Sequence, residues 1–249
     1  MATIDLNSDL GEGAGSDAML MPFITSANIA CGAHAGDERS MRETVLLAKA
    51  SGVAIGAHPG YRDPENFGRK ALELLTADLV ADLVAQIAAL RAIAIAAGTD
   101  VVHVKAHGAL YNSAQHDVDV AGAIVDAVGR SDRSLVLFVF PGSAVERAAR
   151  AAGLRVAREG FIDRAYEGDG TLRSRTHPDA LITDPAAAAR QAVSFMRNGG
   201  VTARDGTFLE LGVDTLCVHG DTPGAPNILR AARAALVAAG LRVERALSG

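Results

Sequence analysis

Short apolar runs alternate with longer amphipathic stretches along the chain, and this pattern predicts strands separated by helices. The runs that predict strands span residues 3–7, 27–31, 53–57, 101–105, 135–140, 155–159 and 214–218, with a last short run at 242–246. The stretches that predict helices span residues 38–51, 77–98, 118–128, 143–152, 185–198 and 225–239. Such repeated alternation predicts a parallel sheet with crossover helices.

The helix predicted over 77–98 has the clearest pattern. Apolar residues recur there at spacings of three and four, as on a core-facing helix: Leu79, Leu83, Ile87, Leu90 and Ile93. A glycine follows five of the predicted helices, where a left-handed C-cap favours it: Gly52, Gly98, Gly153, Gly199 and Gly240. Asp37 is expected to be the N-cap of the helix that begins at residue 38.

Four histidines each follow an apolar run and have a glycine within two residues: His34, His58, His107 and His219. If the strands are parallel, all four imidazoles lie at one rim of one sheet or barrel. Functional sites of parallel α/β proteins are built at that rim, where the strands end. The pattern therefore favours an enzyme.

The first strand carries polar groups at alternate positions: Asp5, Asn7 and Asp9. Alternate residues of a strand share a face, so these groups are expected to point into a closed barrel rather than lie on an open sheet. Buried carboxylates are costly without a cation, a metal or donors. We interpret Asp5 and Asp9 as acid/base or metal-ligand groups. The alternative is that Asp9 caps a turn and Asp5 binds a buried basic residue.

The fourth strand and its exit repeat this arrangement with basic residues, His103, Lys105 and His107, on one face. Lys105 is a candidate counter-charge for the acids of the first strand. It is equally a candidate to hold an oxyanion or a substrate carboxylate. A purely structural ion pair is the alternative.

Other candidate binding residues lie in the predicted rim loops. Asn28 and His34 flank the exit of the second strand, and Arg62 lies in a turn-rich loop where it can clamp a carboxylate. Asp221 lies in a glycine-rich turn before the last helix. Residues 160–182 form a long polar connection, typical of a functional lid, in which Arg164 is a candidate to hold an acidic substrate.

Composition narrows the class of protein. The 249 residues are 49% hydrophobic and contain no long Pro/Ser-rich linker, so one domain spanning residues 1–249 is expected. A net charge of −5 argues against nucleic-acid binding. Cys31 and Cys217 lie in predicted buried strands, which favours a reduced, cytoplasmic protein. No signal peptide and no uncharged apolar stretch of about 18 residues is present, so no membrane association is expected.

Six segments together resemble the LamB/YcsF family, whose members are A subunits of prokaryotic 5-oxoprolinase. They read D-L-N-S-D-L-G-E-G, S-A-N-I-A-C-G-A-H-A-G-D, G-A-H-P-G-Y-R-D, V-K-A-H-G-A-L-Y-N, E-G-F-I-D-R-A-Y and V-H-G-D-T-P-G. They run in the family's order across essentially the whole chain. One departure is Ala106, where the family form K-P-H-G has proline.

The resemblance implies an irregular seven-stranded parallel (β/α) barrel of the glycoside hydrolase/deacetylase type. It also implies ATP-dependent opening of the lactam of 5-oxo-L-proline to L-glutamate, with ADP and phosphate released and with B and C partner subunits. On this hypothesis Asp9 or Asp5 is the base for water. Lys105 and Arg62 neutralise the substrate carboxylate or phosphate, while His107 and His219, with Asp221 beside it, transfer protons.

Fold analogy with deacetylases adds a divalent metal ion, such as zinc, held by Asp9, His58 and His107. The alternative is that these residues contact substrate directly. Two rival functions remain open: a stand-alone metal-dependent deacetylase or amidohydrolase, and a non-catalytic subunit that delivers substrate to its partners.

Overall fold

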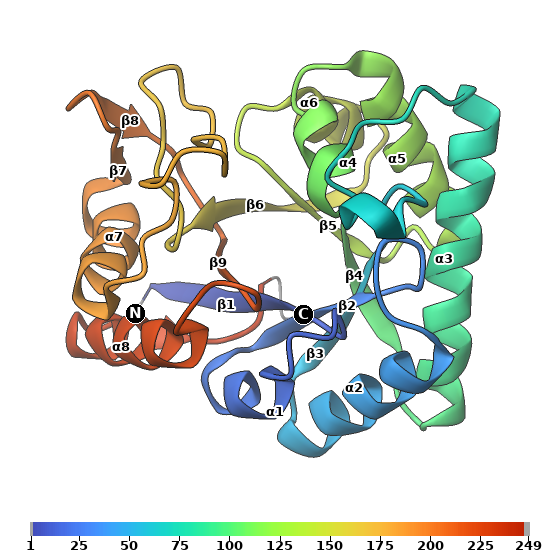
Figure 1. Ribbon diagram of the computed structural model, residues 1–249, viewed down its shortest axis with the longest axis horizontal. Helices are drawn as coiled ribbons and strands as arrows, with labels where there is room; N and C mark the ends of the chain where they lie inside the picture. Colours follow the sequence, from blue (N-terminus) through green and yellow to red (C-terminus); the bar gives the residue numbers. More distant parts are fainter. Residues whose placement is uncertain (1, 247–249) are drawn as a thin grey trace.

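Seven parallel strands form a closed barrel in the computed structural model, which describes residues 2–246 (Figure 1). The strands are β1 (Thr3–Leu10), β2 (Ser26–Ala30), β3 (Ala54–His58), β4 (Val101–Lys105), β5 (Val136–Val139), β6 (Arg155–Phe161) and β9 (Thr215–His219). Their order follows this sequence, and β9 pairs with β1 to complete the ring. The predicted seven-stranded parallel barrel is therefore confirmed.

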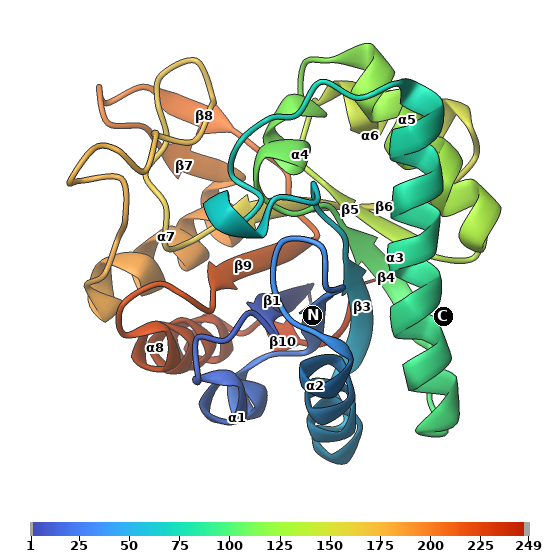
Figure 2. The same cartoon turned by 45° about the vertical axis from the view of Figure 1, so that its right-hand side comes forward.

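Helices cover the outside of the barrel. The six longest are α2 (Glu38–Ser51), α3 (Thr76–Ala96), α5 (Val118–Ser131), α6 (Ala144–Ala151), α7 (Pro185–Asn198) and α8 (Ala225–Ala238). Helices α7 and α8 pack together on one side of the strands, and α3 and α5 pack together on the opposite side (Figures 1 and 2). These helices agree with the six predicted ones to within three residues at each end.

The helix ends also follow the predicted chemistry. The Asp37 side chain accepts a hydrogen bond from the Ser40 backbone N–H and caps α2. All five glycines expected to end helices have a left-handed backbone, with φ between 68° and 82°. A residue with a Cβ atom is strained in this region, which explains why glycine occupies these positions.

Several shorter elements were not predicted. They are α1 (Asp17–Leu20), α4 (Gly108–Ser113), the 3-10 turns η1 (Met21–Phe23) and η2 (Pro64–Asn66), and an antiparallel hairpin of β7 (Gly200–Thr202) and β8 (Phe208–Glu210). Each is too short to show a periodic pattern. The hairpin lies beside the long segment that follows β6, where the Arg204 N–H donates to the Tyr166 carbonyl (Figure 2). A last strand, β10 (Arg242–Val243), pairs with the start of β1.

Helix α3 is long and apolar enough, by length and composition alone, to cross a membrane, and it is the only such helix within residues 2–246. Core helices pass the same test. Leu83, Ile87 and Leu90 of α3 are fully buried in the hydrophobic core. Gln86 on the same face donates to the Gly60 carbonyl and accepts from its N–H. The helix therefore holds the loop that follows β3.

The strand register decides which polar groups lie at the rim. Strand β1 continues to Leu10, so Asp9 belongs to the strand and lies opposite Asn28 of β2 and His219 of β9. Asp5 lies opposite Thr215, at the start of β9. Four residues of strand separate the two acids by about 13 Å. Asp9 is therefore at the carboxyl-end rim, and Asp5 is at the opposite end of the barrel.

Candidate active site

A cavity of about 670 Å³ opens at the carboxyl ends of the strands. Six residues predicted to form the site line it together: Asp9, His58, Lys105, His107, Arg164 and His219. Parts of the segment after β6 form another wall, which includes Arg164, Leu172 and Arg175. The side chains that the sequence disperses from the first strand to the last thus meet in one chamber.

A buried ammonium group lies between two carboxylates at the base of this cavity. Lys105 Nζ is 2.8 Å from Asp9 Oδ1 and 2.9 Å from Glu159 Oε1, and all three side chains are at most 4% exposed. Burial disfavours the charged forms. The charges of His58 and Lys105 outweigh burial and hold the Asp9 pKa well below its usual value, while the carboxylates raise the Lys105 pKa well above its own. Lys105 is therefore a fixed positive charge rather than a nucleophile.

A chain of amide hydrogen bonds holds Asp9 in place. Asn28 Nδ2 donates to Asp9 Oδ1 and to Asn7 Oδ1, both at 2.8 Å. Asn28 Oδ1 lies 2.8 Å from His103 Nε2, and burial lowers the His103 pKa to about 3. The neutral imidazole packs on Gly56, where an added Cβ would lie 2.0 Å from its Nε2 atom. Neither asparagine lines the cavity: Asn28 positions Asp9, and Asn7 accepts a hydrogen bond from Asn28 and so holds it in place.

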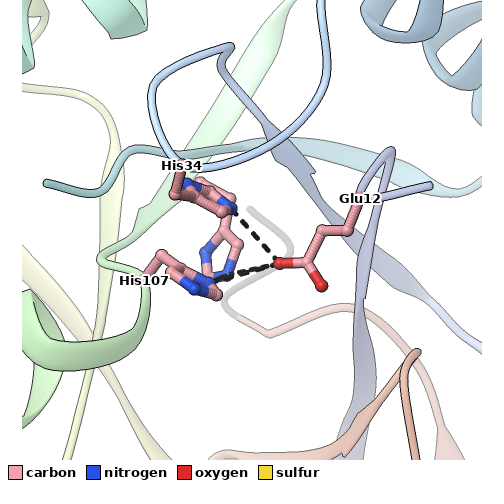
Figure 3. Close-up of side chains that lie close together, drawn as sticks. Glu12, His34 and His107 are labelled. Atoms are coloured by element: carbon pink, nitrogen blue, oxygen red, sulfur yellow. Dashed lines mark hydrogen bonds and ion pairs between the residues drawn. The ribbon is translucent and has the colours of Figure 1, made fainter. Parts of the chain in front are cut away.

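Three histidines and a glutamate form a second cluster, shown in part in Figure 3. Glu12 Oε1 lies 3.3 Å from His34 Nε2, 3.2 Å from His107 Nδ1 and 3.7 Å from His58 Nε2. The rings of His34 and His107 stack with their centroids 3.7 Å apart. Burial lowers the His34 pKa to about 4 and also lowers the pKa of His107, so both rings favour the neutral form.

Backbone carbonyls set the tautomers of two of these rings. His58 Nδ1 lies 2.7 Å from the Lys105 carbonyl, and His107 Nε2 lies 2.9 Å from the Phe67 carbonyl. A carbonyl only accepts, so both of these nitrogens carry protons. Phe67 has a left-handed backbone, with φ 55°. His58 Nε2 and His107 Nδ1 then face each other 3.0 Å apart. Burial opposes the charge of His58, but the Asp9 carboxylate outweighs burial and raises the His58 pKa, so the His58 Nε2 proton lies toward His107 Nδ1. A metal ion bound here would take the place of this proton.

The cluster fits a divalent metal ion. Its four donor atoms lie within 4.8 Å of one another, and the four separations given above run from 3.0 to 3.7 Å. Ligand atoms about 2.0–2.2 Å from one ion have similar mutual spacings. Three carboxylates, of Asp9, Glu12 and Glu159, are buried here with one lysine. Of the predicted metal trio, Asp9 Oδ2 lies 3.5 Å from His58 Nε2, but the Asp9 carboxylate is held by Lys105. Glu12 is the freer carboxylate ligand.

His219 forms a separate acid/base pair on the same cavity. Its Nδ1 lies 3.0 Å from Asp163 Oδ2, which also accepts from the His219 backbone N–H and from Thr222 Oγ1. Burial opposes the Asp163 charge, but His219 and these hydrogen bonds outweigh it and lower the pKa to about 2. The carboxylate fixes the ring with the proton on Nδ1, so Nε2 is the nitrogen left to exchange protons.

Sequence comparisons agree with this architecture. A model of the LamB/YcsF family matches residues 4–248. The chain belongs to the LamB/YcsF family. It is 51% identical over 245 residues to a protein of Symbiobacterium thermophilum named as the A subunit of 5-oxoprolinase, covering 96% of this chain and 94% of that relative.

Solved structures place the LamB/YcsF chain in the same fold. The lactam utilization protein from Thermus thermophilus superposes with a TM-score of 0.90 at 45% identity, covering 97% of this chain and 99% of that one. A T48 deacetylase superposes with a TM-score of 0.50 at 12% identity, covering 97% and 87%, and supports the fold alone.

Three other predicted site residues of the LamB/YcsF chain lie away from the cavity wall. Asp5 is buried at the far end of β1, where Thr25, Ser26 and Thr215 donate to it and burial raises its pKa. Arg62 is mostly exposed and pairs with Asp82. Asp221 does not line the cavity but pairs with Arg69 and Arg175, which do.

Sequence reasoning missed Glu12, Arg69, Glu159, Asp163 and Arg175. Glu159 carried a usable signal, because it lies two residues before Phe161 and so shares the inward face of β6. The glycine-rich run at residues 11–15 suggests a mobile rim loop. In the structure the Glu12 side chain is 4% exposed and bound to histidines, so this loop contributes a site residue. The arginines and Asp163 follow no periodic pattern.

Proposed function

We propose that this chain is the A subunit of an ATP-dependent 5-oxoprolinase, acting in the cytoplasm with B and C partner subunits. The reaction opens the lactam ring of 5-oxo-L-proline to L-glutamate while ATP becomes ADP and phosphate. Relatives about 50% identical over their full length are named as the A subunit of 5-oxoprolinase. The observation that carries the proposal is the fixed charge of Lys105 on the same cavity as the Asp163-oriented His219.

The use of ATP suits this reaction, because the lactam amide of 5-oxo-L-proline resists hydrolysis. A lactam carbon is a weak electrophile because nitrogen donates electrons to the carbonyl. Transfer of the γ-phosphoryl group of ATP to the lactam oxygen, in the assembled complex, releases ADP and leaves an imidate-like carbon that water can attack. The C–N bond of the resulting tetrahedral adduct then breaks as the ring nitrogen takes up a proton, and a second water hydrolyses the acyl phosphate to the glutamate carboxylate and phosphate. In this scheme His219 Nε2 accepts a proton from that water, and Asp163 stabilises the resulting imidazolium. Lys105 Nζ stabilises negative charge that develops on the substrate oxygen.

The structure also refines the hypothesis about the base. Asp9 is a poor proton acceptor because Lys105 and His58 hold its pKa low. We assign it to holding the Lys105 ammonium in position instead. Glu12, His34, His58 and His107 would hold a divalent ion, which when bound supplies a Lewis acid and lowers the pKa of a ligated water.

The test is reconstitution of the chain with its B and C partners. We expect phosphate release that depends on 5-oxo-L-proline and matches glutamate formation. His219→Asn should lower kcat by at least about 10²-fold, as for loss of a general base. The exposed His177 does not line the cavity, so His177→Asn is the matched control and should retain the rate. If phosphate release is independent of 5-oxo-L-proline, the proposal is wrong.

The histidine–glutamate cluster favours one rival, a stand-alone metal-dependent amidohydrolase or deacetylase. That activity would appear in the isolated chain with zinc or manganese and without ATP, and a chelator would abolish it. A non-catalytic, substrate-delivering subunit makes the opposite prediction. Asp9→Asn and His107→Ala would then leave the reconstituted complex fully active.

A further inference from the structure

One buried cation on the cavity wall lacks a counter-ion. Arg164 is 7% exposed, and no carboxylate forms an ion pair with it within residues 2–246. Its Nη2 atom donates to the Arg173 carbonyl at 2.6 Å, while its Nε atom is buried and without a hydrogen-bond partner. A buried charge without a counter-ion is costly, so such a group is a candidate site for a bound anion.

Two further arginines line the same cavity. Arg69, from the loop after β3, and Arg175, from the segment after β6, both pair with the single carboxylate of Asp221. Burial lowers the Arg164 pKa and the charges of Arg175 and Arg69 lower it further, while the charge of Asp163 acts in the opposite direction. The three guanidinium groups outnumber the two carboxylates near them, Asp163 and Asp221, and Asp163 is itself paired with His219. The wall therefore favours binding of an anion.

The part of the cavity around Lys105 has the reverse preference. Asp9 lines the cavity, and Glu12 and Glu159 lie directly against its His107 and Lys105. An anionic substrate that places its reactive group near Lys105 and His219 is repelled by these carboxylates at its charged end. Its lowest-energy orientation therefore directs the negative group toward the arginines.

We propose that Arg164, with Arg69 and Arg175, forms an oxyanion subsite that binds the carboxylate of the lactam substrate. The inference rests on the proposed function and names the residues that recognise the substrate's charged end. A planar guanidinium matches a carboxylate by two parallel hydrogen bonds. A phosphoryl group offers similar oxygens, so the test must separate these two sources.

The test is calorimetric binding to the full chain, with 5-oxo-L-proline, 2-pyrrolidinone and inorganic phosphate as probes. 2-Pyrrolidinone has the same ring without the carboxylate. Arg164→Met should weaken 5-oxo-L-proline binding by about 10- to 100-fold, the range for loss of a charged hydrogen bond, and leave 2-pyrrolidinone binding within about twofold. Arg164→Lys, which keeps the charge but loses the planar fork, should be intermediate.

Two more variants keep the proposal testable. Arg175→Gln changes a partly exposed side chain, so it is informative even if the Arg164 variants do not fold, and it should weaken 5-oxo-L-proline binding about 10-fold. Arg204→Gln is the matched control, because Arg204 pairs with Asp179 and does not line the cavity. In the reconstituted complex the Arg164 and Arg175 variants should raise KM for 5-oxo-L-proline.

Three results would overturn the inference. They are equal weakening of both lactams, loss of phosphate binding with 5-oxo-L-proline binding intact, and no 5-oxo-L-proline binding by the wild-type chain or complex. If 5-oxo-L-proline binds in an Arg164-dependent manner but is not turned over, the subsite stands and the proposed reaction fails. The two proposals are therefore distinguishable.

Discussion

Replacing Asp163 by asparagine tests the proposed acid/base pair most directly. The change keeps the shape of the side chain but removes its charge. The carboxylate now accepts from His219 Nδ1, from the His219 backbone N–H and from Thr222 Oγ1. An amide presents either its oxygen or its NH₂ group to Nδ1. In the second orientation the ring must carry its proton on Nε2, which is the wrong tautomer for a base facing the cavity.

The size of the effect follows from the pKa of Asp163. A fall from 3.8 to about 2 corresponds to about 2–3 kcal/mol of preferential stabilisation of the charged folded state. Loss of hydrogen bonds to a charged group costs a similar amount. In a serine-protease triad the equivalent change lowers kcat about 10⁴-fold. We expect Asp163→Asn to lower kcat by at least about 10²-fold.

The stability part of this prediction depends on pH with a definite sign. Because the pKa of Asp163 is lower in the folded than in the unfolded protein, its contribution is complete above about pH 5. It is lost as the pH falls through 3.8 toward about 2. Urea unfolding of wild type and variant should therefore differ by about 2–3 kcal/mol at pH 7. The difference should shrink at pH 3.

Asp214 provides the matched control. It also accepts hydrogen bonds from a basic residue, Arg158, and its pKa is lowered although burial opposes this, but it does not line the cavity. Asp214→Asn should reduce stability without changing kcat. A pH-independent stability difference for Asp163→Asn, or equal activity of the two variants, would refute the reasoning.

Three further changes test other parts of the site. Lys105→Met leaves two buried carboxylates unpaired and should destabilise the fold by about 3–5 kcal/mol in urea unfolding. Gly56→Ala places a Cβ atom 2.0 Å from His103 Nε2 and should lower the free energy of unfolding by about 1–3 kcal/mol or more. Gly122→Ala in α5 is the control: its Cβ atom meets nothing within 4 Å, so it should not destabilise the fold. Glu12→Gln and His58→Asn should each lower the zinc or manganese content of purified protein, measured by mass spectrometry, from about one per chain.

The sequence predicts the barrel well because its strands and helices each have a regular pattern of apolar residues. Apolar runs of five residues and helix stripes at spacings of three and four recur around the whole ring. Helix ends carry local chemistry that needs no tertiary information, as at Asp37 and Gly52. The β7–β8 hairpin escapes prediction because its strands have three residues each and are mostly exposed.

The site is only partly predictable for a different reason. Strand periodicity gives the direction of a side chain, so it correctly directs Asp9 and Lys105 inward. It does not give the register of neighbouring strands, and therefore it does not give the position of a residue along the barrel axis. Asp5 shares the face of Asp9 but lies at the opposite end of the barrel. Loop residues such as Arg69 and Glu12 follow no period, and their partners are known only once the chain has folded.

The distribution of charge in the cavity connects these observations. One end of the cavity buries Asp9 and Glu159 against Lys105, and Glu12 against three imidazoles. The wall formed by Arg69, Arg164 and Arg175 has the opposite preference, because Arg164 has no ion pair within residues 2–246 and the other two arginines share Asp221. A neutral or uniformly charged ligand satisfies only one of these ends. A small molecule with a polarised amide at one end and a carboxylate at the other satisfies both, and 5-oxoproline is such a molecule.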